Sequence, residues 1–170
     1  QFAQSDEHRY HESLVHPVMS CGSLPRRVLI LGGGDGLAIR EVLKYSSVEE
    51  IDLVDIDPIM TELSKSFGPI KRMNQNSLEN PKVTIFHEDA FNFVQKAHSR
   101  LIKENRLYDR IIIDLPDPHS EVLNKLYTKE FYGLISRVLN DEGSLVSQSA
   151  SPIVTREAFW CINKTMESSG

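Results

Sequence analysis

The chain has 170 residues, of which 40% are hydrophobic and 25% are charged, with 19 Lys and Arg against 24 Asp and Glu. The net charge of −5, without any Lys- or Arg-rich run, argues against nucleic acid or an anionic membrane surface as the main partner. The longest apolar runs are only strand-sized, and Cys21 and Cys161 form neither a metal-binding pair nor a disulfide framework, which fits one globular domain in a reducing compartment.

Short β-branched runs alternate with helical segments along the chain. The runs predict five strands, at Arg27–Leu31, Ile51–Asp55, Lys82–Phe86, Arg110–Asp114 and Gly143–Gln148. Helices are predicted over Leu37–Tyr45, from Asp57-Pro58 onward, over Phe91–Asn105, over Thr128–Asn140, and from Ser151-Pro152 onward. This alternation predicts an α/β fold, a Rossmann-like doubly wound parallel sheet with the strand order 3-2-1-4-5.

The first 22 residues differ from the rest. Tyr10, Leu14, Val15 and Met19 have helical spacing, so we expect residues 1–22 to form a helix that packs against the sheet of residues 23–170. The chain begins at Gln1 and ends without a closing element, so we expect it to be a piece of a longer protein.

The loop after the first predicted strand carries the first ligand signal. In open α/β sheets, ligands bind at the carboxyl ends of the strands where the strand order reverses, here between strands one and four. Gly33 and Gly34 allow the backbone to approach a ligand closely, but no G-x-G-x-x-G fingerprint follows. Asp35 would repel a pyrophosphate by roughly 4 kcal/mol at about 4 Å. The loop therefore favours a cationic ligand, such as the ammonium of an S-adenosyl compound; the alternative is a tight turn that Asp35 caps.

Acidic residues also follow the second and third strands. Asp55 lies about 20 residues beyond the glycine loop, where an acidic residue binds ribose hydroxyls in nucleotide-binding βαβ units. Asp57 is interpreted as a helix N-cap. Asp89 is a candidate acceptor for an adenine amino group, and Ala90 leaves room for the ring. The alternatives are an exposed strand-end acid at Asp55 and a helix cap at Asp89.

Two carboxylates, Asp114 and Asp117, follow the fourth strand in a proline-stiffened loop. They can bind a dication, or bind an amine and deprotonate it. An ammonium with a pKa near 10 attacks nothing until it loses a proton, so such chemistry requires a general base. The alternative is a rigid turn with solvated acids. Tyr10, His11 and Gln148, taken singly, are as well explained by structural roles.

With these residues collected, the chain closely resembles the spermidine synthase (polyamine aminopropyltransferase) family. The matching segments cover nearly the whole chain: Asp6–Glu12, Val28–Gly36 with Arg40–Val42, Val54–Asp57, Glu88–Ala90, Asp114–Pro118, and Leu126-Tyr127 with Phe131-Tyr132. The resemblance implies a fold like that of S-adenosylmethionine-dependent methyltransferases. It also implies transfer of the aminopropyl group of decarboxylated S-adenosylmethionine to putrescine, which yields spermidine and 5′-methylthioadenosine.

The resemblance also implies a role for each candidate residue. Asp114 would be the base that takes the proton from the attacking amine, assisted by Tyr10. Asp117 and Gln148 would help to place the diamine, and His11 would lie near the junction of the aminopropyl group and the amine. The donor would lie against the glycine loop at Gly33 and Gly34. Asp35 would bind its ammonium, Asp55 its ribose, and Asp89 with Ala90 its adenine. No metal and no cofactor are implied, because the donor is a co-substrate with an activated sulfonium leaving group.

The family pattern extends beyond this chain. Its N-terminal β domain and its C-terminal strands are missing here, so residues 1–22 are interpreted as a segment leading out of that β domain and residues 23–170 as the catalytic domain. The resemblance implies a homo-oligomer, a dimer or tetramer, and a cytoplasmic location, with a membrane-anchored parent in some bacterial members. Two alternatives stay open: an S-adenosylmethionine-dependent N-methyltransferase that acts on a polyamine, and a non-catalytic polyamine-sensing module.

Overall fold

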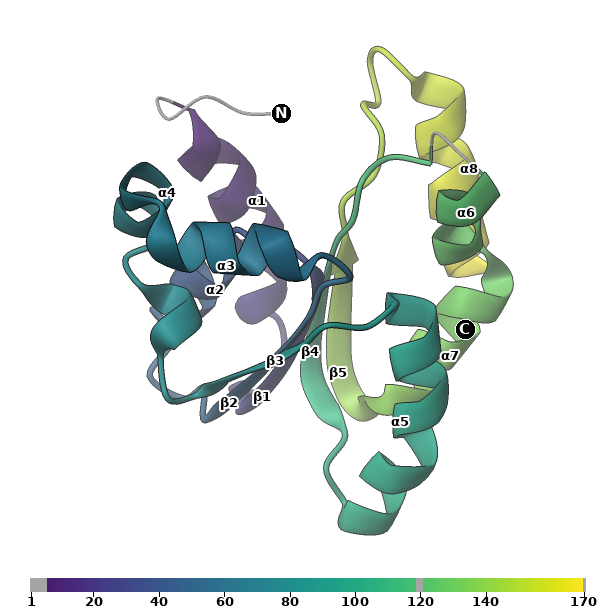
Figure 1. The fold of residues 1–170 in the computed structure, drawn as a ribbon. Helices are drawn as coiled ribbons and strands as arrows, with labels where there is room; N and C mark the ends of the chain where they lie inside the picture. The colour runs from purple at the N-terminus through teal and green to yellow at the C-terminus, as the bar shows by residue number, and fades with distance from the viewer. Residues whose placement is uncertain (1–5, 119–120, 170) are drawn as a thin grey trace.

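A computed structural model describes residues 6–118 and 121–169, so residues 1–5 of the predicted leading segment, and Gly170, lie outside the described part. Five parallel strands form one sheet in the order β3-β2-β1-β4-β5 (Figure 1). The strands are β1 (Arg27–Gly32), β2 (Glu50–Val54), β3 (Val83–Phe86), β4 (Tyr108–Asp114) and β5 (Leu139–Ser147). The predicted fold class and strand order are confirmed.

Helices cover both faces of the sheet (Figure 1). One face carries α1 (Glu7–Met19), α2 (Leu37–Val42), α3 (Pro58–Ser66), α4 (Gly68–Met73) and the 3-10 turn η1 (Ser77–Glu79). The other carries α5 (Ala90–Glu104), α6 (Glu121–Asn124), the 3-10 turn η2 (Lys125–Tyr127), α7 (Lys129–Val138) and α8 (Arg156–Glu167).

The central strands are apolar because both of their faces are buried. Val28 and Ile30 of β1 belong to the core under α1 and α2, whereas Leu29 and Leu31 belong to the core under α5 and α7. This alternation follows from the two-residue period of a strand. Within the described residues, no helix is both long and apolar enough to cross a membrane.

The leading helix is part of this packing. Leu14, Val15 and Met19 of α1 are buried against α2 and the sheet, as the helical spacing predicts. Arg110 of β4 is fully buried and donates hydrogen bonds to backbone carbonyls at the end of α1, including that of Val18 at 2.8 Å. These contacts hold α1 against β4 and β5, beside α2.

Several element boundaries differ from the predictions. The helix predicted over Leu37–Tyr45 ends at Val42. The helix predicted over Thr128–Asn140 ends at Val138, and β5 begins at Leu139 rather than at Gly143. The pairing of β4 with β5 is irregular between Tyr108 and Arg110, and this irregularity accommodates the extra residues of β5.

The last helix also begins later than predicted. The Ser151 hydroxyl accepts hydrogen bonds from the backbone N–H groups of Ile153 and Val154, at 3.3 and 3.1 Å, and so stabilises a separate turn. Helix α8 then begins at Arg156. The Ser-Pro signal was therefore a turn signal here, not a helix start.

Candidate active site

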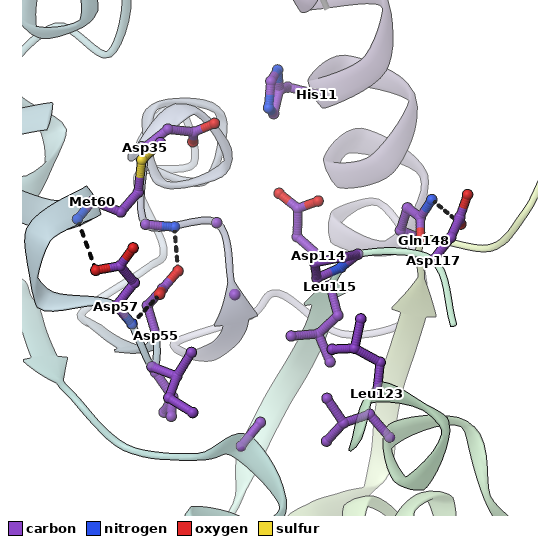
Figure 2. A pocket seen from close by; sticks show the side chains of 18 of the residues that line it. His11, Asp35, Asp55, Asp57, Met60, Asp114, Leu115, Asp117, Leu123 and Gln148 are labelled. Atoms are coloured by element: carbon purple, nitrogen blue, oxygen red, sulfur yellow. Dashed lines mark hydrogen bonds between the residues drawn. The ribbon is translucent and has the colours of Figure 1, made fainter. Parts of the chain in front are cut away.

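A cavity of about 870 Å³ lies at the carboxyl ends of the strands, where the strand order reverses between β1 and β4 (Figure 2). Its lining comes from α1, the β1–α2 loop, the ends of β2, β4 and β5 with the residues that follow them, α3, the β3–α5 loop with the start of α5, α6 and η2. All the predicted site residues line it: Tyr10, His11, Gly33, Gly34, Asp35, Asp55, Asp89, Ala90, Asp114, Asp117 and Gln148. The five acids that follow the predicted strands, Asp35, Asp55, Asp89, Asp114 and Asp117, therefore lie in one crevice at the switch point.

Asp114 lies at the end of β4, directly under the leading helix. The Tyr10 hydroxyl donates a hydrogen bond of 2.5 Å to its Oδ1 atom. Burial raises the pKa of the Asp114 carboxyl above its usual range; the Tyr10 hydrogen bond opposes this rise and the nearby Asp35 adds to it. Burial and the Asp114 charge also raise the pKa of Tyr10, so the phenol keeps its proton. Tyr10 is thus a neutral hydrogen-bond donor to the buried carboxyl group of Asp114.

The glycine loop passes so close to these acids that side chains do not fit. Gly33 has φ +68°, and a Cβ there would lie 3.1 Å from Asp114 Oδ2. A Cβ on Gly34 would lie 2.6 Å from Asp55 Oδ2, which accepts a 2.8 Å hydrogen bond from the Gly34 N–H. The glycines are therefore required by the approach of backbone to carboxylates.

Asp35 both stabilises the turn into α2 and lines the cavity. Its Oδ1 atom accepts a 2.9 Å hydrogen bond from the Leu37 N–H, so it does stabilise the turn into α2. The same side chain lines the cavity, and burial raises its pKa above the usual carboxyl range despite that hydrogen bond. Within the described residues, neither Asp35 nor Asp114 has a Lys or Arg within ion-pair distance.

Asp55 and Asp89 are more engaged with the protein. Asp55 also accepts from the Asp57 N–H at 2.8 Å, and Asp57 caps α3 as predicted. Asp89 caps α5 through the Asn92 N–H and forms a 2.8 Å ion pair with Lys125. Although burial acts to raise the pKa of Asp89, Lys125 and the cap hydrogen bonds keep it below the usual value. The cap alternative for Asp89 is therefore present in the structure.

Asp117 and Gln148 form the β5 side of the cavity. The Gln148 side-chain amide donates to Asp117 at 2.9 Å (Figure 2). The hydroxyl of Tyr127, in η2, donates to the Pro116 carbonyl at 2.8 Å and so holds the loop that carries Asp117. The hydrogen bonds from Gln148 and Tyr127 therefore hold Asp117 and Pro116 in place.

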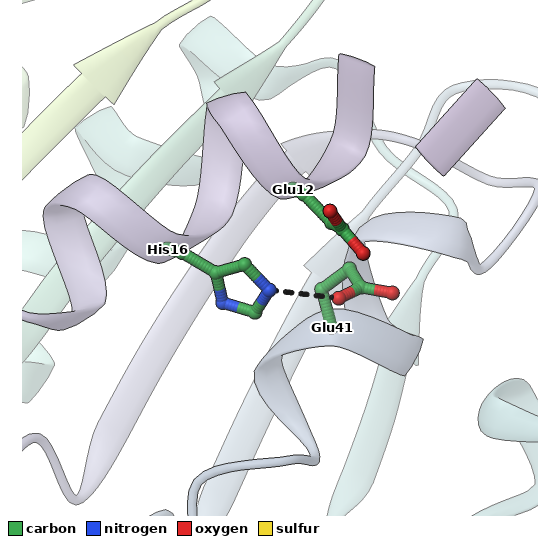
Figure 3. A group of neighbouring side chains, drawn as sticks. All are labelled: Glu12, His16 and Glu41. Carbon is green, nitrogen blue, oxygen red and sulfur yellow. Dashed lines mark ion pairs between the residues drawn. The ribbon is translucent and has the colours of Figure 1, made fainter. Parts of the chain in front are cut away.

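Sequence reasoning missed much of the apolar wall of the cavity. Met60, Leu115, Leu123 and Leu126 line it, beside the acids. Leu115 is recognisable as the residue after Asp114 and Leu126 lies in a segment that matches the family, whereas Met60 and Leu123 carry no signal in their local sequence. Among the described residues, one cluster has metal-binding residue types: the ligand atoms of Glu12, His16 and Glu41 all lie within 4.8 Å of one another (Figure 3).

That cluster is explained by charge pairing. Glu41 is bound by His16 at 3.0 Å, by Lys44 at 2.5 Å and by Arg40 at 2.8 Å. A metal ion would have to displace these partners, so we assign the cluster to the α1–α2 interface.

Residues 7–170 match the family model described as "Spermine/spermidine synthase domain". The chain belongs to the spermine/spermidine synthase family. It is 47% identical over 168 residues to a polyamine aminopropyltransferase of Oceanobacillus iheyensis, covering 99% of this chain and 31% of the relative. It is 44% identical to polyamine aminopropyltransferase 2 of Bacillus cereus, covering all of this chain and 44% of the relative. This chain thus spans less than half the length of these spermidine synthase family members.

Solved structures of the family have the same fold. A spermidine synthase in complex with the transition state analogue AdoDATO has a TM-score of 0.88 at 29% identity, over 99% of this chain and 54% of that one. The spermidine synthase of Thermotoga maritima has a TM-score of 0.83 at 30% identity, over 97% of this chain and 52% of that one. The resemblance found in the sequence motifs is confirmed.

Proposed function

We propose that the protein is an aminopropyltransferase that moves the aminopropyl group of decarboxylated S-adenosylmethionine to putrescine, giving spermidine and 5′-methylthioadenosine. One observation carries the proposal. Two buried acids, Asp35 and Asp114, face the cavity at the switch point without a basic partner among the described residues. Such a site is suited to cationic ligands that supply the missing positive charge. The names of the similar proteins support the same chemistry.

The donor is proposed to lie along the β1–β2–β3 side of the cavity. Asp35 binds its ammonium, and Asp55 accepts from ribose hydroxyls with a carboxylate already oriented by the Gly34 and Asp57 N–H groups. Ala90 leaves room for the adenine, and Asp89 accepts from its amino group while Lys125 holds the carboxylate in place. The donor sulfonium is an activated leaving group, so the protein has only to align it and to manage one proton.

The acceptor is proposed to lie on the β4–β5 side, with Asp117 and Gln148 binding its distal ammonium. Asp114 takes a proton from the reacting amine, and its raised pKa makes it a stronger base than an exposed aspartate. The amine nitrogen then attacks the carbon next to the sulfonium. As the C–N bond forms, the C–S bond breaks, and its electron pair leaves on the sulfur of 5′-methylthioadenosine.

Tyr10 positions the base. Its hydrogen bond to Oδ1 occupies one carboxylate oxygen, so the other, near Gly33, is the one available to the amine. His11 is proposed to lie at the junction of the two substrates.

Two other functions compete with this proposal. An N-methyltransferase would use S-adenosylmethionine itself, whose carboxylate Asp35 would repel. A polyamine sensor would need the acids for recognition but not a buried base with an oriented oxygen.

A product assay tests the proposal. The full-length protein is incubated with putrescine and either donor, and the products are separated by chromatography. We expect spermidine and 5′-methylthioadenosine from the decarboxylated donor. N-methylputrescine from S-adenosylmethionine, with no spermidine, would instead identify a methyltransferase, and no product with either donor would favour a sensor.

A cytoplasmic location fits the exposed free thiols of Cys21 and Cys161. The homo-oligomer implied by the resemblance stays a prediction.

A further inference from the structure

A buried charge cluster lies behind the cavity, where α1 packs on α2. The Arg40 guanidinium donates to both carboxylate oxygens of Glu7, at 2.8 and 3.0 Å. It also donates to Glu41 at 2.8 Å and to the Met73 carbonyl at 2.7 Å. Glu7 and Arg40 are only 5% and 8% exposed. Neither lines the cavity, so neither is explained by ligand binding.

The cluster reaches the cavity through one residue, His11. This side chain is fully buried one helical turn after Glu7, and its Nδ1 atom lies 2.8 Å from the Glu7 carbonyl oxygen and 3.1 Å from Glu7 Oε2. A carbonyl and a carboxylate oxygen only accept hydrogen bonds, so Nδ1 carries the hydrogen. In the neutral imidazole, Nε2 is then the acceptor nitrogen.

The electrostatic surroundings of His11 make its charge important. A positive charge on His11 lowers the pKa of both Asp35 and Asp114. Among the described residues, the titratable and charged groups near the ring include Glu7 and Tyr10 of α1, Asp35 after β1 and Asp114 at the end of β4, with Arg40 of α2 bound to Glu7. A protonated ring would compete with a cationic substrate for these acids and would have no acceptor nitrogen to offer it.

We propose that Glu7 and Arg40 are positioning residues for amine binding: Arg40 neutralises and orients the Glu7 carboxylate, and Glu7 holds His11 as the Nδ1–H tautomer, so that Nε2 accepts a hydrogen bond from a substrate ammonium. The inference rests on the proposed function, because it takes the ligand to be an amine. Arg40 is essential to the arrangement. An uncompensated Glu7 carboxylate beside Nδ1 would favour the imidazolium form.

The test combines ¹⁵N-histidine NMR with kinetics on the full-length protein, and the His11 signals are assigned by their loss in His11→Gln. We expect the wild type to show the neutral Nδ1–H tautomer at pH 7.5. In Arg40→Met, the His11 signals should move toward the imidazolium form, and kcat/KM for putrescine should fall about 10- to 100-fold. Glu7→Gln is the second variant, because it keeps the volume of Glu7 but places an N–H₂ group where the Arg40 guanidinium and the His11 Nδ1–H both donate. We expect the same fall in kcat/KM for putrescine. Arg40→Lys should recover part of the loss.

Glu41→Gln is the matched control, because it removes the other carboxylate bound to Arg40 without touching His11. It should lower the thermal midpoint while leaving the His11 signals and kcat/KM unchanged. The proposal is overturned if Glu7→Gln and Arg40→Met behave like this control. The NMR measurement needs no turnover, so an inactive wild type with Nδ1–H His11 would overturn the proposed function and leave the positioning role supported.

Discussion

The acidic residues at the two ends of the strands differ in how they are paired, although Asp89 at the carboxyl ends is bound by Lys125. At the amino ends of the strands, acids are paired: Glu50 binds Arg27 at 2.9 Å and Arg106 at 2.5 Å, and Asp52 accepts a 2.6 Å hydrogen bond from Tyr108. At the carboxyl ends, Asp35 and Asp114 are buried without such cationic partners among the described residues.

The pKa values follow this division. Burial acts to raise the pKa of Glu50, but its two arginines keep it below the usual range. Burial raises the pKa of Asp35 and the pKa of Asp114, the charge of Asp55 adds to both rises, and the charge of Asp35 adds to the rise of Asp114. Unpaired buried charge lowers stability, so its concentration at one edge indicates a site whose counter-charges come with the ligand.

The largest expected effect is that of Asp114→Asn. Loss of the base should reduce turnover by roughly 10²- to 10⁴-fold, while binding of 5′-methylthioadenosine, measured by calorimetry, should persist. The control is Asp109→Asn at the amino ends of the strands, where the Asp109 carboxylate accepts hydrogen bonds from the backbone N–H groups of Arg26 and Arg27 at 2.7 and 2.8 Å. This change should cost about 1–3 kcal/mol of stability and leave kcat intact. Near-normal turnover of Asp114→Asn would remove Asp114 as the base.

Asp35→Asn should weaken binding of the decarboxylated donor by about 10- to 100-fold, because a charge-assisted hydrogen bond to its ammonium is lost. The same change should raise the free energy of unfolding, because an unpaired buried carboxylate is replaced by an amide. Asp52→Asn should do the reverse, lowering stability without changing donor affinity. Calorimetry and urea unfolding of both variants test the contrast, and a destabilised Asp35→Asn would contradict it.

Tyr10→Phe and Tyr108→Phe remove equivalent hydroxyls, each bound to an aspartate, at 2.5 and 2.6 Å. Since the Tyr10 hydrogen bond lowers the pKa of Asp114, its loss should shift the acid limb of the kcat/KM profile to higher pH and cost about tenfold in kcat. Tyr108→Phe should alter stability alone. A pH–rate profile of Tyr10→Phe that matches the wild type would contradict the positioning role.

The smallest effect concerns stability and pH. Because the folded-state pKa values of Asp35 and Asp114 lie above those of the unfolded chain, their contribution to stability is present below the ordinary aspartate pKa and is lost as the pH rises through the raised values. Glu50 behaves oppositely: its contribution is present above the ordinary glutamate pKa and is lost as the pH falls. Putrescine supplies positive charge to the ionised carboxylates of Asp35 and Asp114. Saturating putrescine should therefore raise the thermal midpoint more at a pH above their raised pKa values than at a pH below the ordinary aspartate pKa. An equal shift on both sides would contradict the account.

Much of the architecture was predictable because it depends on local patterns. The runs Val28–Leu31 and Ile111–Ile113 are apolar on both faces, which identifies central parallel strands, and parallel strands bring their carboxyl ends to one edge. That geometry is why acids far apart in the sequence could be assigned to one crevice.

The rest depends on pairings between distant residues. Nothing near Asp89 indicates that Lys125 binds it, and nothing near Glu7 indicates Arg40, 33 residues away. The turn at Ser151 was misread because a Ser hydroxyl stabilises a turn as readily as a helix start. The break between α3 and α4 at Phe67 is different, because Gly68-Pro69 is a local signal for the end of one helix and the start of the next, and the prediction of one helix from Asp57-Pro58 onward overlooked it.

We expect the cationic ligand to supply the counter-charge that Asp35 and Asp114 lack at the carboxyl ends of the strands. The most direct test is a calorimetric comparison of decarboxylated S-adenosylmethionine with S-adenosylmethionine, which differ by one carboxylate, on the full-length protein. We expect the decarboxylated donor to bind more tightly by about tenfold or more, and we expect Asp35→Asn to reduce this difference. Equal affinities, or a preference for S-adenosylmethionine, would contradict it.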